Sequence, residues 1–94
     1  MIIDPEEHEL GALLARLPAV DRCSVVEVGC GDGRLTRRYS PCVGSVLAID
    51  PDEAAVAAFR SEGVAGHVDL RATSIDRLEL PDGSVDVVLF SWAL

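Results

Sequence analysis

The sequence predicts an α/β protein built on a doubly wound parallel sheet. Apolar, β-branched segments of strand length alternate along the chain with segments of helical pattern. A glycine-rich turn, Gly29–Gly33, joins the first of these strands directly to a helix. This alternation is typical of parallel sheets with right-handed crossovers. We therefore expect four parallel strands with flanking helices, in a single domain over residues 1–94.

The first expected element is a leading helix over residues 4–17. Asp4 suits the N-cap, Pro5 suits the first helical position, and Glu7 completes a capping box. Four leucines then follow at the spacing of one helical face, namely Leu10, Leu13, Leu14 and Leu17. Pro18 ends the pattern, so the helix is expected to stop there.

The next elements surround the glycine turn. A strand is expected over Cys23–Val28, and a helix from Arg34 to about Tyr39. A second apolar strand, Ser45–Asp50, ends in an acidic residue. The following helix opens at Pro51–Glu53 and ends near Gly63, a residue that suits a C-terminal cap.

The last part of the chain contains two further strands. The third is expected near His67–Ala72, where apolar residues alternate only briefly. Residues 73–80 are expected to form a connecting loop with room for one helical turn. Turn residues at Pro81–Ser84 then lead into Val85–Phe90, which reads as a parallel strand covered on both faces. Asp86 is expected to serve the start of this strand rather than catalysis.

The charged residues exclude several kinds of site. Acidic residues number 16 against 8 basic ones, and all the basic residues are arginine. Without lysine the chain has no P-loop nucleotide site and no Schiff-base chemistry. A net charge of −8 also argues against nucleic-acid binding, which depends on clustered basic side chains. The densest basic group is Arg34, Arg37 and Arg38, of which Arg37 and Arg38 are expected on the outer face of their helix.

Cysteine spacing and hydropathy define the expected environment. Cys23, Cys30 and Cys42 match neither a zinc motif nor a paired disulfide framework, so we expect buried or loop thiols and no metal site. No apolar run approaches the roughly 20 residues of a membrane span. The N-terminus lacks the pattern of a signal peptide. A cytoplasmic protein without membrane attachment is therefore expected.

The glycine turn separates two cofactor classes. A dinucleotide fingerprint needs a third glycine at position 34, which holds Arg34, so NAD or FAD binding is disfavoured. Carboxylates suit a cationic ligand better than a pyrophosphate. Three such side chains accompany the turn, namely Glu27, Asp32 and Asp50.

Three segments carry a resemblance to a known family. Val26–Leu35 resembles the first motif of the class I S-adenosylmethionine-dependent methyltransferases, and Ala48–Pro51 resembles their second motif. Leu78–Val88 is similar to the loop and fourth strand of the branch that methylates small molecules. The resemblance covers about residues 22–94. It implies a Rossmann-like fold with S-adenosylmethionine as the cofactor.

The resemblance also implies which residues bind the cofactor. The methionine part would lie against Glu27, Gly29, Cys30, Gly31 and Gly33, the ribose against Asp50, and the adenine against Pro51, Ser74 and Ile75. Ser74 stands where the family frequently has Asp, and this uncharged acceptor weakens the adenine contact. Asp50 also suits an N-cap of the following helix, which is an alternative or additional role.

The resemblance implies transfer of a methyl group to a small-molecule acceptor. Such transfer is an in-line displacement from an activated donor, so positioning can supply much of the catalysis and no catalytic residue is named. The alternative is a catalytically silent module that binds the cofactor or dimerises.

Family members continue past the fourth strand, so the chain corresponds to the N-terminal half of the fold and is expected to be incomplete at its C-terminus. The fourth strand would then have an uncovered edge. We expect a homo-oligomer or a partner chain to cover that edge.

Overall fold

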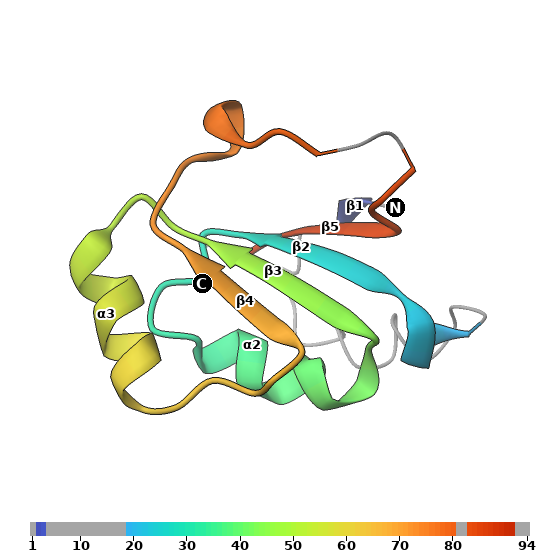
Figure 1. Cartoon of the computed structure of the whole chain (residues 1–94), viewed down its shortest axis with the longest axis horizontal. Coiled ribbons are helices and arrows are strands. Elements are labelled where there is room, and N and C mark those ends of the chain that lie inside the picture. The colour runs from blue at the N-terminus through green and yellow to red at the C-terminus, as the bar shows by residue number, and fades with distance from the viewer. Residues whose placement is uncertain (1, 4–18, 81–82, 92–94) are drawn as a thin grey trace.

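The computed structural model describes residues 2–3, 19–80 and 83–91 of the chain. Within them, five parallel strands form one sheet in the order β1-β5-β2-β3-β4 (Figure 1). The strands are β1 (Ile2–Ile3), β2 (Ser24–Val28), β3 (Ser45–Ile49), β4 (Val68–Arg71) and β5 (Val87–Phe90). The α-helices are α2 (Arg34–Tyr39) and α3 (Glu53–Ser61), and single 3-10 turns occupy Val20–Arg22, Ser40–Cys42 and Ile75–Arg77.

The Rossmann-like fold is confirmed. All four predicted strands are present, and the structure begins or ends some of them one or two residues inside the predicted bounds. After β4 the chain returns to the other side of β2, so the strand order reverses between β2 and β5. Ligands of such sheets bind beyond the carboxyl ends of the strands at this reversal.

Some predicted features fall outside the described residues. These are the leading helix over 4–17 and the Pro81–Asp82 part of the turn. Among the helices that are described, none combines the length and the apolar character needed to cross a membrane.

The sequence did not predict the short strand β1. It pairs with β5 through Ile2 opposite Val88 and Ile3 opposite Leu89. The edge of β5 was expected to be uncovered, and at these two positions it is instead paired within the chain. Two residues are too few for an alternating pattern to identify a strand. Coverage of the remaining edge by a second chain stays a prediction.

The two faces of the sheet are packed differently. Side chains alternate along each strand, and Figure 1 shows α2 and α3 on the same side of the sheet. On that side Val25, Val46 and Leu89 pack with Phe59 of α3, which is 1% exposed. The opposite side carries a smaller buried cluster around Val26, against which Leu78 packs from the segment that follows β4. The larger core therefore lies beneath the helices.

Asp86 acts at the start of β5, as the sequence predicted, and Asp52 has a local role that the sequence analysis did not assign to it. The Asp86 carboxylate accepts a hydrogen bond from the Ser24 backbone N–H at 2.8 Å, which ties the start of β5 to β2. The Asp52 carboxylate accepts from the N–H groups of Ala54 and Ala55 at 3.0 and 3.2 Å. Asp52 is therefore the N-cap of α3.

We predict that Gly33→Ala destabilises the chain more than Gly31→Ala. Both glycines have positive φ, at 86° and 55°, where an L-residue costs roughly 1–2 kcal/mol. A Cβ at Gly33 would lie 2.4 Å from the Phe59 ring, whereas one at Gly31 meets nothing within 4 Å. Urea unfolding should give a loss of about 2–4 kcal/mol for Gly33→Ala, because overpacking adds to the strain. Equal losses for the two variants would contradict this packing.

Candidate cofactor site

The glycine turn after β2 folds back over the end of β3. Gly29 and Cys30 both direct their N–H groups to the Ile49 carbonyl oxygen, at 2.8 and 3.0 Å. The Gly33 N–H donates to the Cys30 carbonyl at 3.0 Å, which closes the turn just before α2 begins. Gly29, Gly31 and Gly33 all have positive φ. The turn is thus held by backbone hydrogen bonds, two of them to the end of β3, and space remains open beside Gly31.

Asp50 links this turn to the segment that leads into α3. Its Oδ2 accepts the Gly31 N–H at 2.9 Å, and its Oδ1 accepts the Asp52 N–H at 2.8 Å. Because Asp52 caps α3, the alternative role of Asp50 as that cap is not the one observed. Each carboxylate oxygen can accept more than one hydrogen bond. Asp50 is therefore oriented by two backbone donors and retains capacity for a ligand.

Glu27 lies beneath the turn, on the helix-covered face of β2. Its side chain is 0% exposed. Its Oε1 accepts hydrogen bonds from the Thr36 hydroxyl at 2.7 Å and the Tyr39 hydroxyl at 2.6 Å, both on α2. Its Oε2 lies 2.7 Å from the Ser91 hydroxyl, just after β5. A buried carboxylate is stable only with such partners, since it has lost its hydration.

The sequence reasoning missed the hydroxyl partners of Glu27. The resemblance implied that Glu27 lines the methionine part of the cofactor, and that contact stays a prediction. The described contacts of its carboxylate are with Thr36, Tyr39 and Ser91. One signal was available, because an acid in an apolar strand needs donors and Thr36 and Tyr39 are three residues apart on one helix.

The Tyr39 hydroxyl and the Cys30 thiol are both affected by the Glu27 carboxylate, and the pKa of each is raised. Burial, together with the negative charge of Glu27 and the hydrogen bond to it, raises the pKa of Tyr39 far above its usual range. Burial, with smaller contributions from the charges of Glu27 and Asp50, raises the pKa of Cys30 to about 12. The Cys30 side chain packs in the core, and its thiol lies 3.8 Å from the Gly31 carbonyl oxygen of the turn.

The residues expected to contact adenine come from two neighbouring loops. In the sheet register Ile49 lies opposite both Val28 and Arg71, so β2, β3 and β4 end at the same edge. Pro51 is exposed in the loop after β3. Ser74 precedes the 3-10 turn after β4, and Ile75 begins that turn with 44% of its surface exposed. An exposed aliphatic side chain is suited to packing against a flat aromatic ring.

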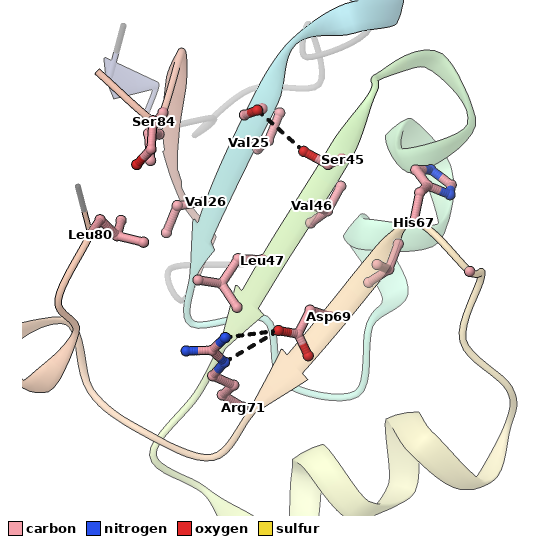
Figure 2. Close-up of a pocket in the computed structure, with 14 residues that line it drawn as sticks. Val25, Val26, Ser45, Val46, Leu47, His67, Asp69, Arg71, Leu80 and Ser84 are labelled. Atoms are coloured by element: carbon pink, nitrogen blue, oxygen red, sulfur yellow. Dashed lines mark hydrogen bonds and ion pairs between the residues drawn. The ribbon is translucent and has the colours of Figure 1, made fainter. Parts of the chain in front are cut away.

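A groove of about 570 Å³ lies elsewhere, on the sheet face opposite α2 and α3. Figure 2 shows Val26 and Leu47 on its floor, with Leu80 and Ser84 on the segment beside it. Its lining includes none of the residues predicted to bind the cofactor. The groove is therefore separate from the site formed by the glycine turn.

Comparison with known proteins connects this site to a family. Residues 25–94 match a family model described as a methyltransferase domain. The chain is 32% identical over 97 residues to a phosphoethanolamine N-methyltransferase of Triticum aestivum, a match that covers 97% of this chain and 19% of that protein. It is 39% identical over 71 residues to a probable S-adenosylmethionine-dependent methyltransferase of Mycolicibacterium smegmatis, covering 72% and 27%.

A solved structure supports the same comparison. The phosphoethanolamine N-methyltransferase 1 of Haemonchus contortus, in complex with phosphoethanolamine and S-adenosylhomocysteine, superimposes with a TM-score of 0.72 at 25% identity. The match covers 83% of this chain and 17% of that one. The chain thus spans 19% and 27% of the lengths of the two curated relatives and 17% of the length of the Haemonchus contortus protein.

We predict that Tyr39, the one tyrosine of the chain, does not ionise at its ordinary pKa of 10.0 while the protein is folded. Because the unfolded chain does ionise there, folding stability should fall as the pH rises above about 10. Glu27→Gln should lower the Tyr39 pKa but leave it raised, because burial is the largest cause. Ultraviolet absorbance of tyrosinate, followed with circular dichroism, checks both points. Tyrosinate forming near pH 10 in the folded protein would contradict them.

Proposed function

We propose that the chain forms the cofactor-binding part of a methyltransferase. The premise is that it belongs to the family of class I S-adenosylmethionine-dependent methyltransferases. The observation that carries the proposal is the Asp50 carboxylate, which the Gly31 N–H orients at the carboxyl end of β3. The glycine turn and this acid together match what a nucleoside with a cationic substituent requires. The open space beside Gly31 lets the nucleoside approach the backbone closely, and the carboxylates favour the cationic substituent.

The residues beside the turn fit S-adenosylmethionine. A Cβ at Gly31 would meet nothing within 4 Å, so a ligand can approach the backbone closely there. The remaining lone pairs of Asp50 are suited to the two ribose hydroxyls. Pro51 and Ile75 are both exposed and would pack on the adenine, with the Ile75 N–H and the Ser74 hydroxyl as polar contacts.

The proposed roles are binding and orientation. S-adenosylmethionine supplies a methyl group that is already activated on a sulfonium, so the protein needs mainly to hold the donor in line with an acceptor. The buried charge of Glu27 and the exposed carboxylate of Asp32 both lie on or beside the turn and favour a cation there. No residue of the chain is assigned as a general base.

We infer further that the acceptor is a small molecule. The Triticum aestivum relative is a phosphoethanolamine N-methyltransferase, and the Haemonchus contortus structure contains phosphoethanolamine. These are properties of those proteins, and they support a small polar acceptor as the first class to test.

We predict that Asp50→Ala weakens binding of S-adenosylmethionine and S-adenosylhomocysteine by about 1.5–3 kcal/mol, the range for hydrogen bonds to a charged group. Isothermal titration calorimetry measures the dissociation constant of each ligand. Glu53→Ala, which removes an exposed acid three residues further along the chain, is the matched control and should bind as the unaltered chain does. An unchanged dissociation constant for Asp50→Ala would refute the assignment. Absence of binding to the unaltered chain would refute the proposed function.

We predict methyl transfer from isotopically labelled S-adenosylmethionine to low-molecular-weight acceptors, with phosphoethanolamine as the first candidate. Mass spectrometry of the small-molecule and macromolecular fractions identifies the product, and Asp50→Ala should lower its yield. Label found only in protein or nucleic acid would contradict a small-molecule acceptor. Cofactor binding without any transfer would favour the alternative, a catalytically silent binding module.

A further inference from the structure

Arg37 makes more contacts than its expected place on the outer face of α2 implied. Its side chain is 37% exposed. One guanidinium nitrogen, Nη1, donates to the Asp32 carbonyl oxygen at 2.9 Å and lies 3.2 Å from the Glu62 carboxylate. The other, Nη2, donates to the Phe59 carbonyl at 3.1 Å and lies 3.5 Å from the Gly63 carbonyl. The guanidinium thus joins the glycine turn to the C-terminal end of α3.

The same side chain covers the ring that supports the turn. The guanidinium carbon of Arg37 lies 4.6 Å from the centroid of the Phe59 ring. The ring in turn fills the space into which a Cβ at Gly33 would project. Arg37, Phe59 and Gly33 therefore form one stack, in which a cation over the aromatic face is favourable.

Both elements that Arg37 joins contribute to the proposed site. The glycine turn presents Gly31 to the ligand, and α3 begins directly after the segment that carries Asp50. At the amino end of α3 the two are connected by the hydrogen bond from Gly31 to Asp50. At its carboxyl end the connection is made by Arg37. The relative position of turn and helix is thus fixed at two points.

We propose that Arg37 is a positioning residue for the cofactor: it holds the glycine turn against α3 so that Gly31 and Asp50 keep the geometry that binds S-adenosylmethionine. The inference rests on the proposed function for its ligand, but the ordering of the turn by Arg37 is a property of the free chain. A planar guanidinium is required, because the single ammonium of a lysine cannot reach the carbonyl acceptors of the turn and of α3 and the Phe59 ring together.

The test compares Arg37→Gln with Arg38→Gln in the full chain. Arg38 is the next residue of the same helix and is exposed, so its substitution removes an equal charge. Arg37→Gln should raise the dissociation constants of S-adenosylmethionine and S-adenosylhomocysteine about 5- to 20-fold, a range that follows from losing hydrogen bonds to a charged group at a partly exposed site. Arg37→Lys should bind more weakly than the unaltered chain, and Arg38→Gln should bind equally well.

Amide hydrogen exchange without ligand separates positioning from general stability. In Arg37→Gln the Gly31 and Gly33 amides, which both donate hydrogen bonds within the site, should exchange faster, while the Val26 and Leu47 amides in the sheet keep their protection. A uniform increase across the chain would overturn the proposal, since Arg37 would then act on overall stability only. Unchanged exchange in the turn would overturn it as well. Failure of the unaltered chain to bind would refute the proposed function, and the exchange comparison would still decide the role of Arg37.

Discussion

Glu27 places a fully buried carboxylate on the central strand of the sheet, between α2 and the end of β5. An ionised group without water is stable only when hydrogen bonds replace its hydration, and removing such partners is costly. Thr36 and Tyr39 supply two of these bonds from α2, and Ser91 supplies the third from the end of β5. A carboxylate on the central strand therefore fixes a helix above the sheet and the end of the neighbouring strand beside it.

The geometry of the glycine turn follows from that anchoring. Once β2 and α2 are held by Glu27, five residues must reverse the chain between them, from Gly29 to Gly33. The Ile49 carbonyl accepts two N–H groups of the turn, and the Asp50 carboxylate accepts a third. The turn is thus shaped before any ligand arrives, which lowers the entropy lost on binding. Arg37 restrains the turn further, since it connects the turn to the C-terminal end of α3.

The sequence was sufficient where a local pattern determines the structure. Apolar runs of strand length identified three of the four main strands, and a brief alternation identified the strand near His67–Ala72. The glycine turn with Asp50 at a matching interval identified the candidate site. It was insufficient where the structure depends on distant pairing. The strand β1 has only two residues, and the bond from Ser91 to Glu27 joins positions 64 residues apart. The role of Arg37 was also missed, because helical periodicity shows which face a residue occupies but not which carbonyl groups approach it from another element.

The glycine turn separates packing from the proposed ligand contact within five residues. Gly33 faces inward, where the Phe59 ring leaves no room for a side chain, and Glu27 lies entirely beneath the turn. Gly31 faces outward into open space, beside a carboxylate with unused acceptor capacity. Gly33 is required for packing, which acts through the core whether or not a ligand is bound. Gly31 shares the positive φ, and the open space beside it adds access for the proposed ligand. A turn of this kind can be stable in the free chain and still leave its backbone open to the proposed cofactor, because the Phe59 ring and the Ile49 carbonyl support it from within the fold while the space beside Gly31 stays open.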